Sequence, residues 1–133
     1  MSERSDRLPD AQPDSWECLA QVIDTAALER VRRAAASPAS VARTAAIFSA
    51  LSDPTRLRIL DALGIEELCV CDLAEVCEIS QSGVSHQLRL LRDRGLVAYR
   101  RDGNRAVYRL ADDHVLALLA QAMEHADEGV DAS

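Results

Sequence analysis

Two cysteines, Cys69 and Cys71, lie one residue apart, and a third, Cys18, lies near the amino terminus. Cysteine thiolates bind soft ions such as cadmium and lead, and they also bind zinc. In the middle of a regular helix, residues with this spacing point about 200° apart, so Cys69 and Cys71 can share an ion only where a helix begins. We therefore expect a thiolate-rich metal site formed by these three cysteines. Oxygen ligands could come from three carboxylates, Asp14, Glu17 or Asp72.

Each cysteine also has a simpler interpretation. Cys69 and Cys71 fit as two small packed residues, and Cys18 fits as an exposed thiol. Cys77 lies near the end of a predicted short helix, where a small buried residue fits, so we do not expect it to bind metal. Because the amino-terminal residues lack an apolar secretory signal, we expect a cytoplasmic protein, in which cysteines are thiols or metal ligands rather than disulfides.

A second set of possible ligands comprises two histidines and two carboxylates near the carboxyl terminus, Asp112, His114, His125 and Glu128. His114 and His125 are 11 residues apart, or about three helical turns, so they share a face at opposite ends of one helix. Two antiparallel helices across a dimer axis bring the first pair of one chain against the second pair of the other. Such a nitrogen and oxygen shell suits tetrahedral zinc. The alternative is a charged helix end with incidental histidines.

The formal net charge of −7 argues against a nucleic-acid partner, but the distribution of charge favours one. Residues 80–110 carry seven Arg and two Asp, a net charge of +5, while the segments before and after them each carry −6. A basic segment between two acidic ones is typical of a nucleic-acid-binding face. A solvated charged surface is the alternative interpretation.

Polar residues that suit base edges lie at the start of a predicted helix within this basic segment, namely Gln81, Ser82, Ser85 and His86. Recognition helices present their amino-terminal residues to the major groove, where short side chains donate and accept hydrogen bonds. Five arginines are candidates for phosphate contacts, the last three from the predicted wing, namely Arg89, Arg92, Arg100, Arg101 and Arg105. The alternative is an ordinary amphipathic helix whose polar side chains face water.

Local signals predict the elements that position these residues. Asp53-Pro54 and Ser80 are helix-start signals, and Asp102-Gly103 is a strong hairpin turn. Apolar spacing predicts helices at residues 25–36, 41–51, 54–63, 70–77, 81–94 and 112–127. Strands are predicted at residues 96–101 and 104–110. In the helix at 70–77, we expect Leu73 and Val76 to point inward.

The order of short helix, tight turn, second helix and hairpin predicts a mainly α winged helix-turn-helix with a two-stranded wing. We expect a flexible arm at residues 1–24, a DNA-binding and dimerisation domain at 25–128, and a disordered tail at 129–133. The first and last helices have apolar faces without a partner in so small a domain, so we expect them to pair in a homodimer. No apolar run is long enough to span a membrane, so we expect no membrane partner.

Four motifs together resemble the ArsR/SmtB family of metal-sensing winged-helix repressors, over about residues 40–128. They are Asp53-Pro54-Thr55-Arg56-Leu57, Cys69-Val70-Cys71-Asp72-Leu73-Ala74, Val84-Ser85-His86-Gln87-Leu88-Arg89 and Gly95-Leu96-Val97. The resemblance implies a dimer that binds palindromic operator DNA without metal and releases it on binding zinc, cadmium or lead. It also implies both ligand sets, since similar family members combine arm cysteines with the Cys-x-Cys pair and carry a matching carboxyl-terminal zinc motif.

An arsenite- or redox-responsive repressor that uses Cys69 and Cys71 is the alternative function. Arsenite sensors of the family carry a third cysteine three residues after the second, where this chain has Ala74. A metal-blind DNA-binding module is a further alternative, which tight metal binding would exclude. An enzyme such as a zinc hydrolase needs an open coordination position and a general base, and the sequence shows no motif for one. We therefore expect neither catalysis nor a small organic substrate.

Overall fold

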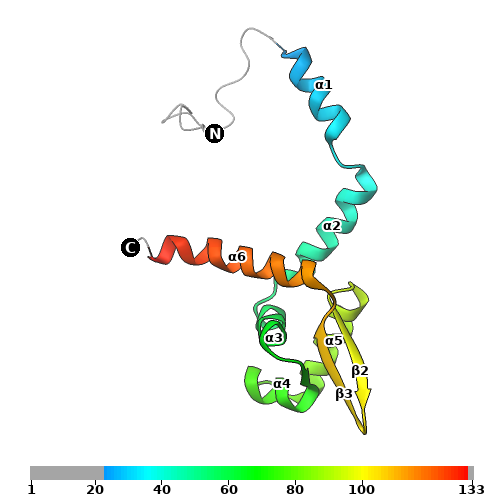
Figure 1. The fold of residues 1–133 in the computed structure, drawn as a ribbon, viewed down its shortest axis with the longest axis vertical. Coiled ribbons are helices and arrows are strands. Elements are labelled where there is room, and N and C mark those ends of the chain that lie inside the picture. Colours follow the sequence, from blue (N-terminus) through cyan, green and yellow to red (C-terminus); the bar gives the residue numbers. More distant parts are fainter. Residues whose placement is uncertain (1–22, 132–133) are drawn as a thin grey trace. The chain divides into compact units, whose positions relative to one another are not determined.

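The structure, a computed structural model, describes residues 23–131, which form three helices, a short strand, two helices, a hairpin and a last helix in that order (Figure 1). Their bounds are α1 (Thr25–Ala34), α2 (Pro38–Leu51), α3 (Pro54–Ile65), β1 (Leu68–Cys69), α4 (Val70–Cys77), α5 (Gln81–Asp93), β2 (Val97–Asp102), β3 (Arg105–Leu110) and α6 (Asp113–Asp131). The chain divides into two compact units, residues 1–37 and 38–133, and all of these elements except α1 belong to the second. The order and types of the elements confirm the predicted winged helix-turn-helix.

Capping signals determine where the helices of the second unit begin. The Asp53 carboxylate accepts a 3.0 Å hydrogen bond from the backbone N–H of Arg56, and Pro54 occupies the first helical position, where its missing N–H is not needed. The Ser80 hydroxyl caps α5 by accepting from the backbone N–H of Gly83 at 3.0 Å. Helix α2 begins at Pro38, earlier than the predicted start after Ser40, because a proline favours the first helical turn.

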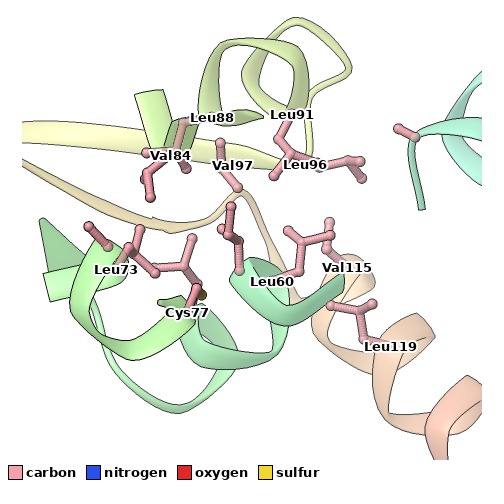
Figure 2. Close-up of a cluster of buried hydrophobic side chains, with 14 residues drawn as sticks. Leu60, Leu73, Cys77, Val84, Leu88, Leu91, Leu96, Val97, Val115 and Leu119 are labelled. Carbon is pink, nitrogen blue, oxygen red and sulfur yellow. The ribbon is translucent and has the colours of Figure 1, made fainter. Parts of the chain in front are cut away.

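Aliphatic side chains from α3, α4 and α5 meet in one core (Figure 2). Spacings of three and four residues put Val84, Leu88 and Leu91 on one side of α5, and each is at most 1% exposed. Leu60 of α3 and Leu73 of α4 face them and are 0% exposed. Buried residues of β2 and α6 belong to the same cluster. The core therefore packs the helix-turn-helix, the wing and the last helix together.

The sheet contains three strands in the order β1-β3-β2, one strand more than predicted. Strand β1 spans only two residues, too few to show any alternation in the sequence, and it pairs Leu68 with Tyr108 and Cys69 with Val107. Strands β2 and β3 form the wing, an antiparallel hairpin (Figure 1). At its turn Gly103 has a φ of 65°, a conformation that glycine adopts without strain.

The inward face of α4 differs from the prediction at one position. Val76, expected to point inward, is 55% exposed, whereas Cys77 is 1% exposed. The buried face of this eight-residue helix is centred between Leu73 and Ala74, and a helical rotation of about 100° separates Val76 from that centre. The prediction for Val76 was therefore wrong because a short helix buries only a narrow stripe.

Helix α6 is longer than predicted. It ends at Asp131 rather than near Asp127, so it includes the first three residues of the segment expected to form a tail. Gly129 does not stop the helix, because a single glycine costs only about 1 kcal/mol relative to alanine. Within residues 23–131, no helix is both long and apolar enough to cross a membrane.

Leu73→Ala should lower the free energy of unfolding by about 2–5 kcal/mol, because it opens a cavity in the centre of the core. Val76→Ala, on the same helix, should change it by less than about 1 kcal/mol, because the Val76 side chain faces solvent. Urea unfolding followed by circular dichroism, at one fixed protein concentration, measures both variants. Equal decreases would contradict this assignment of the buried face of α4.

Candidate functional site

The exposed face of α5 carries the residues predicted to read DNA. All four are exposed at the beginning of the helix, namely Gln81, Ser82, Ser85 and His86. The burial of Val84 and Leu88 on the other side of the helix fixes this orientation. Arg89 continues the exposed face one turn further along. The positive end of the helix dipole at this first turn adds a region that attracts phosphate.

Helix α5 joins the wing through a tight, hydrogen-bonded turn. Gly95 has a φ of 74°, and its N–H donates to the carbonyl of Arg92 at 2.9 Å. The N–H of Leu96 donates to the carbonyl of Leu91, also at 2.9 Å. This pair of bonds is the Schellman motif, which ends a helix on a left-handed glycine. Strand β2 begins two residues after Gly95, so only a short connection separates the helix from the wing.

Two contacts that sequence reasoning missed hold α5 in place. The Arg92 guanidinium lies 5.3 Å from the centroid of the Tyr99 ring, and Tyr99 in turn lies 5.3 Å from Tyr108 on the neighbouring strand. On another side, Arg56 Nη1 donates to Gln87 Oε1 of α5 at 3.2 Å. The only sequence signal for Arg56 was its place in the Asp53-Leu57 motif. These contacts orient the helix relative to both α3 and the wing.

The wing separates its three predicted phosphate-binding arginines. Side chains alternate along a strand, so Arg101 points to the opposite face from Arg100 and Arg105. Arg100 Nη2 lies 2.9 Å from Glu67 Oε1, and Arg105 Nη2 lies 3.7 Å from Asp102 Oδ2. All three arginines are exposed. The wing therefore carries cationic groups on both faces, not on one.

Cys69 lies at the start of α4, as the sequence predicted. It is the N-cap residue, with φ −89° and ψ 175°, and it is 6% exposed. Its Sγ donates a 3.2 Å hydrogen bond to Asp72 Oδ2 and accepts a 3.8 Å hydrogen bond from Arg105 Nη1. Cys71, in the first turn, is exposed, and both cysteines line one depression of about 250 Å³ with Arg105. The structure therefore places two sulfurs and one carboxylate at the same edge of the molecule.

Of the other two cysteines, the structure describes Cys77 and does not describe Cys18. Cys77 packs in the core, and burial raises the pKa of its thiol more than the nearby Arg58 guanidinium lowers it. A buried thiol of this kind is a poor metal ligand, because metals bind the thiolate. Cys18, the predicted third ligand, lies outside the described residues, as do Asp14 and Glu17.

The four predicted ligands on the last helix form two separate pairs. His114 Nδ1 lies 3.5 Å from Asp112 Oδ1, and His125 Nδ1 lies 3.8 Å from Glu128 Oε1. The two histidine side chains are 97% and 90% exposed. A rise of 1.5 Å per residue separates the pairs by about 16 Å along α6. Each end of the helix thus presents one imidazole and one carboxylate to solvent.

Neither ligand set completes a metal shell within residues 23–131. In that part of the chain, no group of three or more His, Cys, Asp or Glu side chains lies close enough to hold an ion. The types of donor nevertheless fit metals, since two sulfurs with a carboxylate suit a soft ion and each imidazole-carboxylate pair supplies half of a zinc shell. Completing either shell requires further residues of the chain or a second chain.

Known proteins are similar to about two thirds of this chain. A sequence profile of bacterial regulatory proteins of the ArsR family matches residues 53–99. A transcriptional repressor SmtB homolog of Synechocystis is 54% identical over 84 residues, which are 63% of this chain and 64% of the relative. A cadmium resistance transcriptional regulatory protein CadC homolog of Staphylococcus aureus is 44% identical over 93 residues, which are 69% of this chain and 74% of the relative. The chain therefore spans just under two thirds of the first relative.

A solved structure shows the same fold. It is the homodimeric winged helix-turn-helix DNA-binding domain of a possible ArsR-family transcriptional regulator from Mycobacterium bovis. The two chains are 33% identical and align with a TM-score of 0.69, over 75% of this chain and 95% of that one. Sequence and fold agree with the resemblance carried by the four motifs, and this chain belongs to the ArsR family of bacterial regulatory proteins.

Proposed function

We propose that this chain is a metal-responsive transcriptional repressor, which binds palindromic operator DNA as a homodimer without metal and releases it on binding zinc, cadmium or lead. The observation that carries the proposal is the position of the Cys69 and Cys71 depression against the wing residue Arg105. A ligand site built partly from the wing can alter the DNA-contacting surface directly. The names of the two relatives, a transcriptional repressor homolog and a cadmium resistance regulator homolog, support this function.

Duplex DNA is the partner that best fits the exposed face of α5. Ser85 and His86 offer short hydrogen-bonding groups to base edges, while Arg89 and Arg101 are exposed and suited to phosphates. The net charge of +5 over residues 80–110 concentrates a favourable potential here, although the chain as a whole carries −7. Base edges then provide the sequence preference, and the phosphates provide most of the affinity.

A homodimer is supported by apolar side chains that α6 and the first two helices leave exposed. Val31 of α1 is 62% exposed, Val41 and Phe48 of α2 are 56% and 54% exposed, and Leu116 of α6 is 44% exposed. A two-fold dimer holds its two α5 helices at one spacing, which suits a palindromic operator. In the proposed cytoplasmic protein, residues 1–24 form an arm and residues 25–128 form the DNA-binding and dimerisation domain.

The proposed thiolate site combines Cys69 and Cys71 with Cys18 of the arm. Asp72 is the described carboxylate that contacts Cys69, so it is the nearest source of an oxygen ligand. A bound soft ion would join the sulfurs of the arm, β1 and α4. Because the ion and the DNA favour different arrangements of these segments, each weakens the binding of the other. The coupling free energy is the same in both directions and is typically about 1–3 kcal/mol or more.

The proposed zinc sites lie between the two α6 helices of the dimer. Asp112 and His114 of one chain meet His125 and Glu128 of the other, so each dimer contains two such sites. The exposure of both histidines leaves them accessible to a second chain. Residues of α6 that bind across the dimer axis link the two protomers, so a change there moves both α5 helices together. We propose that both the thiolate and histidine sites can drive release.

An arsenite- or redox-responsive repressor is the second candidate function. Ala74, at the position where arsenite sensors of the family have a cysteine, is 9% exposed and belongs to the core cluster. Because position 74 has no sulfur, α4 lacks the third cysteine of those arsenite sensors, and this weakens the arsenite function. Release by arsenite or an oxidant, with no release by zinc, cadmium or lead, would favour this second function.

Arg101→Ala should weaken binding to operator and random DNA alike, because an exposed wing arginine contacts phosphates. The plot of log affinity against log salt should become shallower by about 0.9 for each phosphate that the variant no longer neutralises. Ser85→Ala should instead reduce the preference for operator over random DNA by about 1–3 kcal/mol. Fluorescence anisotropy with a palindrome selected from random duplexes, and with a scrambled duplex, measures both. Equal binding of the two duplexes by metal-free wild-type protein would contradict the repressor function.

Cadmium or lead added to the reduced, metal-free protein should produce sulfur-to-metal charge-transfer absorption in the near ultraviolet. Cys69→Ser/Cys71→Ser should abolish this absorption, and Cys18→Ser should reduce it. Cys77→Ser is the matched control and should leave it unchanged, because Cys77 packs in the core. Unaltered absorption in the double variant would rule out the proposed thiolate site.

Zinc binding to mixed dimers should show whether the histidine sites cross the dimer axis. Homodimers of His114→Ala, and homodimers of His125→Ala, should lose both sites. A dimer with one protomer of each variant should regain one site, because one intact His114 then meets one intact His125. A Cys69→Ser/Cys71→Ser background removes the thiolate site, and competition with a chromophoric chelator counts tight zinc ions. Mixed dimers that bind no tight zinc would contradict a site shared between protomers. If zinc releases the His114→Ala/His125→Ala protein from operator DNA as fully as it releases wild-type protein, the cysteines are the zinc switch.

A further inference from the structure

Arg105 is the wing arginine that touches the candidate thiolate site. It begins β3, two residues after the Gly103 turn, and its Nη1 donates to Cys69 Sγ at 3.8 Å. Its Nη2 lies 3.7 Å from the Asp102 carboxylate, and the side chain is 57% exposed. The guanidinium therefore lies between the sulfur on one side and solvent, where a DNA phosphate can approach, on the other.

Backbone pairing fixes the position of this contact. Cys69 pairs with Val107 across the β1-β3 ladder, and Arg105 lies two residues before Val107 on the same strand face. Cys69 is 6% exposed, so its sulfur has little freedom to move away from Arg105. The long arginine side chain is the mobile partner of the pair.

Metal coordination changes what Cys69 offers to Arg105. In the metal-free protein Cys69 Sγ donates a hydrogen bond to Asp72 Oδ2 at 3.2 Å and accepts a longer one from Arg105 Nη1 at 3.8 Å. A cysteine binds an ion as the thiolate, and the thiol proton passes to solvent. The coordinated sulfur carries negative charge and accepts a charge-assisted hydrogen bond, which is stronger than the neutral one. Occupation of the thiolate site thus favours the arrangement in which Arg105 contacts sulfur.

We propose that Arg105 couples the thiolate site to DNA, because its guanidinium contacts a DNA phosphate when the metal-free protein is bound to DNA and contacts the Cys69 sulfur when the protein holds metal. This inference rests on the proposed repressor function and identifies the residue through which the thiolate site acts. Release through this route occurs within one protomer and withdraws one arginine from the phosphates at each wing.

The other wing arginines serve as controls because the structure gives them different partners. Arg100 contacts Glu67 at 2.9 Å rather than a cysteine. Arg101 lies on the opposite face of the hairpin, away from Cys69. Arg101→Ala therefore removes the same charge from the same hairpin without touching the thiolate site.

The test compares wild-type protein with Arg105→Ala and Arg101→Ala. Cadmium affinity without DNA, read from charge-transfer absorption under chelator competition, should fall about tenfold in Arg105→Ala and stay unchanged in Arg101→Ala. Both variants should show a shallower salt dependence of DNA binding in the metal-free state, by about 0.9 for each phosphate left without its arginine. The factor by which cadmium weakens operator binding should shrink about tenfold in Arg105→Ala and persist in Arg101→Ala. Measuring cadmium affinity with and without operator should return the same factors.

The outcomes separate this inference from the proposed function. Cadmium that leaves operator binding of the wild-type protein unchanged would contradict release through the thiolate site itself. Cadmium that releases wild-type and Arg105→Ala protein by the same factor, at the same cadmium affinity, would overturn the role of Arg105 and leave the repressor function intact. Far-ultraviolet circular dichroism of each variant checks that the fold is retained.

Discussion

The packing of α5 against the core is the constraint on which both candidate surfaces depend. Val84, Leu88 and Leu91 are almost completely buried, and each such side chain contributes about 1.5–3 kcal/mol when it leaves water. Their burial turns the polar beginning of α5 outward, where DNA can reach it. It also requires α4 to present Leu73 and Cys77 to the same core (Figure 2). The orientation of α4 then leaves Cys71 exposed at its first turn.

The two-residue pairing of β1 with β3 brings the thiolates to the wing. Leu68 pairs with Tyr108, and Tyr108 packs on Tyr99, which lies beneath Arg92 of α5. A continuous series of contacts therefore runs from Leu68, beside Cys69, to the end of α5, the helix that carries the candidate DNA-binding face. His114 contacts Asp112 and His125 contacts Glu128, each pair at one end of α6, so the proposed zinc sites depend on a second chain.

Local signals in the sequence were sufficient for most of the fold. Ser80, Asp53-Pro54 and Asp102-Gly103 act through neighbouring backbone groups, and the structure has a helix start or a turn at each. Strand β1 escaped prediction because two residues show no periodicity. The end of α6 was misplaced because Gly129, a residue type that commonly follows the end of a helix, lies inside this one.

The residue types of the candidate site were also readable from the sequence, but their neighbours were not. The Cys69 position at a helix start followed from its spacing to Cys71 and from the helix prediction. Its contact with Arg105 joins residues 36 positions apart, and only the register of the β1-β3 ladder brings them together. Similarly, Glu67 meets Arg100 through sheet packing that no local pattern encodes.

The Schellman turn at Gly95 connects α5 so closely to the hairpin that the two move as one rigid unit. Two 2.9 Å backbone hydrogen bonds close the connection, and the Arg92-Tyr99 contact braces it, so there is no hinge at which rotation of one part could be absorbed. The hairpin extends about 20 Å from that fulcrum, so a rotation of α5 by about 10° carries its tip through about 3.5 Å. A displacement of that size exceeds the length of a hydrogen bond. Small angular changes at the core are therefore amplified at the outermost arginines, which move further than any residue of α5.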